Sequence, residues 1–112
     1  MKAKNLFNKA MQYGGLTINS KSMPVTYKRG YQVSVRDCYK LRVENAQKIV
    51  NAIDSVLARI KKGQFCGLWI DEGYIYIDIS VRIADRLDAV IIGERLNQKS
   101  IYDWKNDNCI ML

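Results

Sequence analysis

Histidine is absent from this sequence of 112 residues. Because imidazole is the base in Ser-His-Asp and Cys-His catalysis and a very common metal ligand, both kinds of site are excluded. Glycine-rich phosphate loops and the common hydrolase motifs are missing as well. Two carboxylate pairs, Asp71 with Glu72 and Asp78 with Asp85, fall in a turn and on a solvated sheet face, where we expect little change in pKa. The sequence therefore predicts a binding protein without metal or cofactor, not an enzyme.

Cysteine and long apolar runs are also scarce. The three cysteines, Cys38, Cys66 and Cys109, form no C-x-x-C pair, so a zinc ribbon or thioredoxin-type site has no support. We expect ordinary buried thiols in a reducing cytoplasm. No segment approaches the roughly 18 consecutive apolar residues of a membrane span, and the first eleven residues lack the apolar core of a signal peptide. These patterns predict a cytoplasmic protein that does not enter a membrane.

Basic residues outnumber acidic ones, 18 against 11, for a net charge of +7. The excess is uneven, because residues 1–63 carry 13 basic and 3 acidic side chains whereas residues 64–112 carry 5 and 8. A chain of this length holds one domain, spanning residues 1–112. Composition and charge together indicate a small basic binding module.

Hydrophobic spacing predicts an α+β fold. Helical periodicity covers residues 4–13, 43–62 and 85–97, and strand-like runs cover residues 16–19, 31–35, 38–41, 100–104 and 109–112, with a hairpin turning at residues 71–73. The expected architecture is a mostly antiparallel sheet with two main helices packed on one face, in the order β-β-α-β-β-α-β. Asp85 and Asp88 resemble an N-cap with its acidic partner, and Gly93 inside the last helix suggests close packing.

The hairpin offers the strongest candidate site. Alternation places Leu68, Ile70, Ile75, Ile77, Ile79 and Val81 on the core face, and Trp69, Tyr74, Tyr76, Asp78, Ser80 and Arg82 on the other face. Aromatic rings there could stack on a nucleotide base, while Arg82 could grip a phosphate. The same residues are equally typical of a subunit interface or of cross-strand pairs on a plain sheet surface.

Two further segments carry candidate ligand-binding residues. Lys28 and Arg29, flanked by tyrosines and followed by Gly30, suit an anionic ligand close to the backbone, although a solvated loop explains them as well. Arg95 and Asn97, at the exit of the last predicted helix, supply hydrogen-bond donors. A polar helix end needs such residues in any case.

Three segments resemble a group of small phage and prophage proteins. Gly67–Ser80 follows a G-x-W-x-D-x-G-x-x-Y-x-D-x-S hairpin pattern, Ile92–Asp103 follows a helix exit with N-Q and I-Y-D, and Lys28–Ser34 is similar to a strand entry of that group. Together they cover about half of the chain. The group is identified here with the anti-Thoeris sponge family, which binds and sequesters cyclic ADP-ribose-type immune signals without degrading them.

The resemblance implies a ligand held at a subunit interface of a dimer or higher oligomer. The matching positions are Trp69, Tyr76, Asp78, Arg95 and Asn97, with Lys28 or Arg29 at a second site for cyclic oligonucleotides. One departure concerns Arg95, which lies one position later than the family pattern, about 100° further around the helix. This shift puts the role of Arg95 in doubt.

Two alternatives remain open. The protein could be an anti-CRISPR-type inhibitor that binds a host defence nuclease directly, although its positive charge argues against mimicry of nucleic acid. It could also be a small basic nucleic-acid-binding protein, whose affinity would fall steeply with salt. Sequence-specific binding of nucleic acid is not expected.

Overall fold

The computed structural model describes residues 1–112 as three helices and a six-stranded antiparallel sheet. The helices are α1 (Ala3–Tyr13), α2 (Ala46–Arg59) and α3 (Arg86–Arg95). The strands are β1 (Gly15–Ile18), β2 (Tyr31–Arg42), β3 (Gln64–Asp71), β4 (Tyr74–Ile83), β5 (Ser100–Asp103) and β6 (Asn108–Met111). Their order across the sheet is β1-β3-β4-β2-β5-β6. The α+β class and the antiparallel sheet are confirmed.

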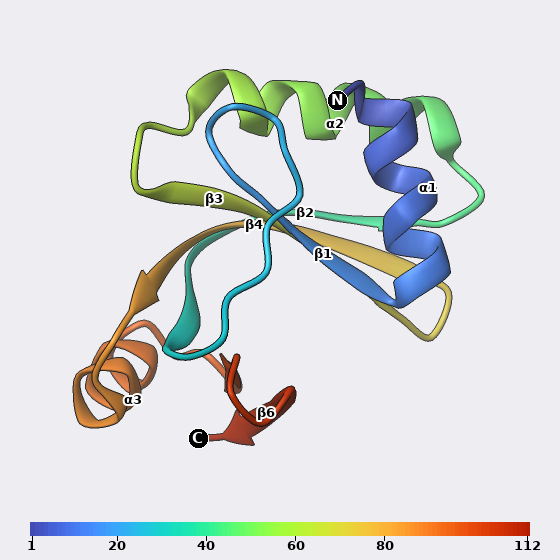
Figure 1. The fold of residues 1–112 in the computed structure, drawn as a ribbon. Helices are drawn as coiled ribbons and strands as arrows, with labels where there is room; N and C mark the ends of the chain where they lie inside the picture. Colours follow the sequence, from blue (N-terminus) through green and yellow to red (C-terminus); the bar gives the residue numbers. More distant parts are fainter.

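The main core lies between the sheet and the pair α1 and α2, which stand together on one side of the sheet in Figure 1. Isoleucines at every second position of β4, namely Ile75, Ile77 and Ile79, are at most 7% exposed. They meet Ile49 and Ile53 of α2, both fully buried. Burial of such side chains is the dominant favourable contribution to folding.

A second, smaller core lies under α3, at the other end of the molecule (Figure 1). Its buried members are Val33, Ala89 and Ile101. The side chain of Asp85 caps α3 by accepting a hydrogen bond from the backbone N–H of Asp88 at 3.0 Å, as the sequence predicts. Close packing at Gly93 is also confirmed, because an added Cβ would lie 3.1 Å from Cγ2 of Ile101.

Strand β2 differs most from expectation. The sequence predicts two short strands over 31–35 and 38–41, whereas the structure has one strand of twelve residues. Its pairing with β4 shifts between Ser34 and Arg36 and again between Asp37 and Tyr39. Each shift is a bulge that breaks the two-residue alternation, which is why the pattern looked like two strands. The helix α2 is also shorter than the predicted 43–62, since residues 43–45 form a turn and Ile60 is extended.

Most of the outer edge of β2 is not paired with another strand. Strand β5 pairs only with Tyr31 and Gln32 of β2, so the outer side of β2 has no neighbouring strand beyond Gln32. Bulges and charged residues such as Arg36 and Lys40 are common means of preventing such an edge from pairing with another chain.

The cysteines are less uniformly buried than expected. Cys66 is buried, but Cys38 is only half-buried and Cys109 is exposed. The expectation of three buried thiols is therefore wrong for Cys109, because β6 is a short strand at the edge of the sheet. None of the three helices has the length and apolar character needed to cross a lipid bilayer.

The two cores differ enough in size to predict unequal local stability. The main core has 15 buried residues and the core under α3 has three, so α3, β5 and β6 should open at a lower free energy than α2, β3 and β4. Native-state hydrogen exchange should show weaker protection at Ala89 and Ile101 than at Ile53 and Ile77. Equal protection of the two regions would contradict this reading.

Candidate functional site

The aromatic pair Trp69 and Tyr76 lies on the sheet face that points away from α1 and α2. The two residues are cross-strand partners on β3 and β4, and Trp69 is 50% exposed. On its other side Trp69 pairs with Gly15 of β1, where an added Cβ would lie 3.3 Å from Cε3 of the indole. The missing side chain at Gly15 thus leaves room for the ring. The predicted division of the hairpin into a core face and an aromatic face is confirmed here.

Cations border this aromatic surface on the β2 side. The Lys40 ammonium lies 4.6 Å from the ring centre of Tyr74 and 5.6 Å from that of Tyr76. The Arg42 guanidinium lies 5.4 Å from the Tyr74 ring and forms the single ion pair of the chain, with Glu44 at 3.2 Å. Lys40 therefore has aromatic neighbours but no carboxylate partner, which leaves its charge available to an anion.

Asp78 occupies the centre of this face. Its cross-strand partner on β3 is Gly67, and the carboxylate of Asp78 fills the space that a side chain at position 67 would need. The Oδ1 atom is buried and has no hydrogen-bond partner. Buried polar atoms are nearly always paired, so an unpaired one calls for an explanation.

The carboxyl group of Asp78 is a weaker acid than an ordinary aspartic acid. Burial raises its pKa to about 6, and the nearby Asp37 carboxylate also raises it. The expectation that Asp78 sits in a solvated setting with an ordinary pKa is therefore wrong. Its acidic neighbour is Asp37 of β2, its partner in the ladder, and not Asp85. Sequence alone could not pair residues from strands so far apart.

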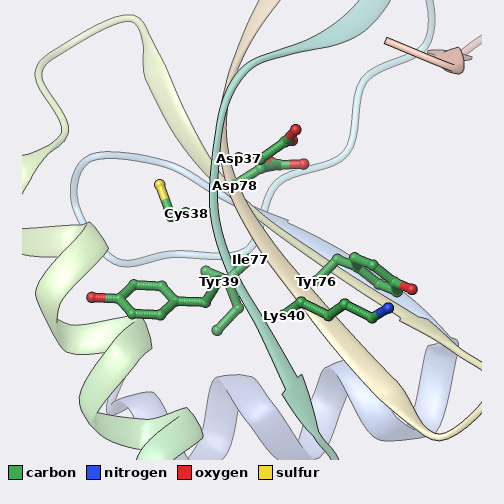
Figure 2. A pocket seen from close by; sticks show the side chains of 7 residues that line it. All are labelled: Asp37, Cys38, Tyr39, Lys40, Tyr76, Ile77 and Asp78. Carbon is green, nitrogen blue, oxygen red and sulfur yellow. The ribbon is translucent and has the colours of Figure 1, made fainter. Parts of the chain in front are cut away.

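A hollow of about 330 Å³ lies beside this pair of carboxylates. Its lining residues are Asp37, Cys38, Tyr39, Lys40, Tyr76, Ile77 and Asp78. Figure 2 shows Asp37 and Asp78 pointing the same way, with Tyr76 and Lys40 also on their side of the strands, while Cys38 and Tyr39 point toward the opposite side. The bulge at Cys38 brings Asp37 and Lys40 to the same face although they are three residues apart.

The rest of the polar face is covered, which the sequence did not reveal. Tyr27, from the loop before β2, packs edge-to-face on Phe65 and on Trp104, with ring centres 5.9 and 5.5 Å apart. Beneath them Trp104 donates through Nε1 to Gln32 Oε1, and Gln32 donates to Ser80 Oγ. Ser80 is only 4% exposed as a result. This end of the face is a second hydrophobic layer and not an open platform.

Arg82 belongs to that covered end. Its guanidinium donates two hydrogen bonds to the backbone carbonyl of Arg29, at 3.1 and 2.6 Å, and lies 4.4 Å from the ring centre of Tyr27. Arg82 thus holds the loop that contains Tyr27 and Arg29 against the sheet. The side chains of Lys28 and Arg29 are exposed on that loop.

Arg95 and Asn97 lie elsewhere. Arg95 is the last residue of α3, and Asn97, two residues later, has a positive φ of 57°. Both are exposed, and α3 is remote from the hairpin turn between β3 and β4 (Figure 1). Within one chain the structure therefore groups Trp69, Tyr76 and Asp78, groups Arg82 with Lys28 and Arg29, and leaves Arg95 and Asn97 apart from both.

This geometry defines a small antiparallel α+β protein with a hollow along the unpaired part of β2, lined by aromatic and acidic side chains among others. No group of three or more cysteine and carboxylate side chains is arranged to hold a metal ion. The chain matches no known family, no curated protein and no solved structure.

Asp78 should make stability depend on pH. Because its pKa in the fold is about 6, above the ordinary value of 3.8, the folded state binds this proton more tightly than the unfolded state. The contribution of Asp78 to the free energy of unfolding is therefore largest below pH 4 and is lost as the pH rises through 6. We expect Asp78→Asn to raise the free energy of unfolding at pH 8, by at most about 3 kcal/mol, and to change it little at pH 4.

Urea unfolding of the two proteins at pH 4, 6 and 8 measures this difference. Asp54→Asn, on the exposed side of α2, is the charge-matched control. A stability difference between wild type and Asp78→Asn that stays constant from pH 4 to pH 8 would refute the assignment.

Proposed function

We propose that this protein binds a small nucleotide in the hollow beside Trp69, Tyr76 and Asp78 and holds it without converting it. The observation that carries the proposal is the buried, unpartnered Oδ1 of Asp78. Such a group lowers stability unless something pairs with it, and the half-exposed Trp69 lies two residue pairs further along the β3–β4 ladder. A ligand that stacks on the rings and donates to the carboxylate fits both features.

The ligand class follows from the three kinds of side chain around the hollow. Aromatic rings stack on any base, Lys40 can meet a phosphate, and carboxylates accept hydrogen bonds from hydroxyl or amino groups. A nucleotide carries all three partners in one molecule. The volume of about 330 Å³ is at the lower end of the range for small-molecule sites.

Sequestration fits better than turnover. The chain has no histidine. Cys38 lines the hollow, but its thiol donates to the backbone carbonyl of Arg36 and not to a base that could activate it. The resemblance to anti-Thoeris sponges gives the finer proposal, which is capture of a cyclic ADP-ribose isomer, or of a cyclic oligonucleotide, in the cytoplasm of an infected host.

The same resemblance gives a role to the remaining candidates. In a dimer or higher oligomer, Arg95 and Asn97 of one protomer would complete the site around Trp69 and Tyr76 of another, and Lys28 or Arg29 would serve a second ligand. This arrangement accounts for the separation of the two groups within one chain.

A second candidate function is binding of nucleic acid. With 18 basic residues and a single ion pair, nearly all cations of this protein are free to meet phosphates. Affinity for random-sequence DNA that falls steeply between 50 and 200 mM salt would favour this function. Direct binding to a host defence nuclease remains the other alternative, and pull-down with such a nuclease would test it.

Calorimetric titration with cyclic ADP-ribose isomers and cyclic di- and trinucleotides tests the main proposal. We expect stoichiometric binding of at least one of them, and release of the intact ligand on heating. Absence of binding by all of them at micromolar protein would refute sequestration, and recovery of a degraded ligand would indicate an enzyme.

Substitution locates the site. Because stacking contributes about 1–3 kcal/mol per base, Trp69→Ala should weaken binding roughly tenfold or more. Leu87→Ala, an exposed apolar residue of α3 that is 65% accessible, is the matched control and should bind normally. Normal binding by Trp69→Ala would place the ligand elsewhere, and weak binding by Arg95→Ala would support a site shared between protomers.

A further inference from the structure

Two carboxylates stand side by side in the hollow. Asp37 and Asp78 are partners in the β2–β4 ladder and point to the same side (Figure 2). Ser34 donates from Oγ to Asp37 Oδ1 at 3.3 Å, whereas Oδ1 of Asp78 is the one buried side-chain atom of the chain with no partner. The two carboxylates can therefore accept more hydrogen bonds than the protein donates to them.

The charges around Asp37 and Asp78 limit the kinds of ligand group that can bind to them. Phosphate oxygens are acceptors and carry negative charge, so two neighbouring carboxylates disfavour them. The cation of the hollow, Lys40, lies over the rings of Tyr74 and Tyr76, so phosphate is better placed on that side. The carboxylate side is left for a neutral group with more than one donor.

A ribose provides such a group. Its 2′- and 3′-hydroxyls are neutral, adjacent donors, and acidic side chains are the usual partners of ribose hydroxyls in dinucleotide sites. Gly67 supports the same arrangement, since the Asp78 carboxylate lies against its backbone, where a Cβ would otherwise be. Any larger residue at position 67 would displace the carboxylate.

We propose that Asp37 and Asp78 bind the vicinal hydroxyls of a ribose, with the base on Trp69 and Tyr76 and the phosphate toward Lys40. This inference rests on the proposed nucleotide-binding function and adds the feature that selects the ligand. The protein should therefore discriminate ribonucleotides from their deoxy counterparts, which the aromatic surface alone cannot do.

Calorimetry with cyclic ADP-ribose and with its two 2′-deoxy analogues, each lacking the 2′-hydroxyl of one of the two riboses, tests the inference on the unmodified protein. Hydrogen bonds to a charged group are strong enough that one of the two analogues should bind about tenfold to hundredfold more weakly. In Asp78→Asn and Asp37→Asn this ratio should fall toward one. The Asp54→Asn control should keep the wild-type ratio.

The outcomes separate the two claims. Equal affinity of wild type for cyclic ADP-ribose and for both analogues would overturn the ribose assignment while leaving nucleotide binding in place. No binding of any of the three ligands would overturn both. Loss of fold cannot mimic the expected result, because Asp78→Asn removes a destabilising charge and its folded content can be checked by circular dichroism before titration.

Discussion

The alternation of side chains along β4 is the constraint on which the rest of the structure depends. Ile75, Ile77 and Ile79 must face α1 and α2 to form the main core. A strand has a period of two, so the intervening Tyr76 and Asp78 are forced onto the opposite face. The proposed site is therefore fixed by the core. A shift of one residue in the pairing of β3 and β4 would destroy both.

Asp78 lowers the stability of the folded protein, and the proposed binding function would give that cost a reason. A carboxyl group that burial brings to a pKa of about 6, with an unpaired oxygen, is a net cost to the folded protein, and Gly67 is needed simply to make room for it. Groups of this kind cluster at functional sites, where binding supplies the missing partner. The neighbouring layer of Tyr27, Phe65 and Trp104 has the opposite character, since the indole N–H of Trp104 is bonded to Gln32 and the three rings cover that end of the sheet.

Local patterns predicted the elements well and the site only in part. The two faces of the β3–β4 hairpin, the Asp85 cap and the packing at Gly93 follow from spacings within a dozen residues. The bulges of β2 were missed because they break the alternation on which such reasoning relies. Long-range contacts were missed for a different reason: Trp104 meets Gln32 across 72 residues, and Asp37 reaches Asp78 only through strand pairing. The hydrogen bonds from Arg82 to the backbone carbonyl of Arg29, 53 residues away, were missed for the same reason.

Amide and indole NMR spectra, recorded as cyclic ADP-ribose is added, test the central claim most directly. The chain has two tryptophans, and their indole N–H signals report on the two ends of the same face. The account predicts large shifts for the Trp69 indole and for the amides of Tyr76 and Asp78. It predicts little change for the Trp104 indole, which is bonded to Gln32. Shifts at Trp104 or along the Lys28–Arg29 loop, with Trp69 unchanged, would contradict it.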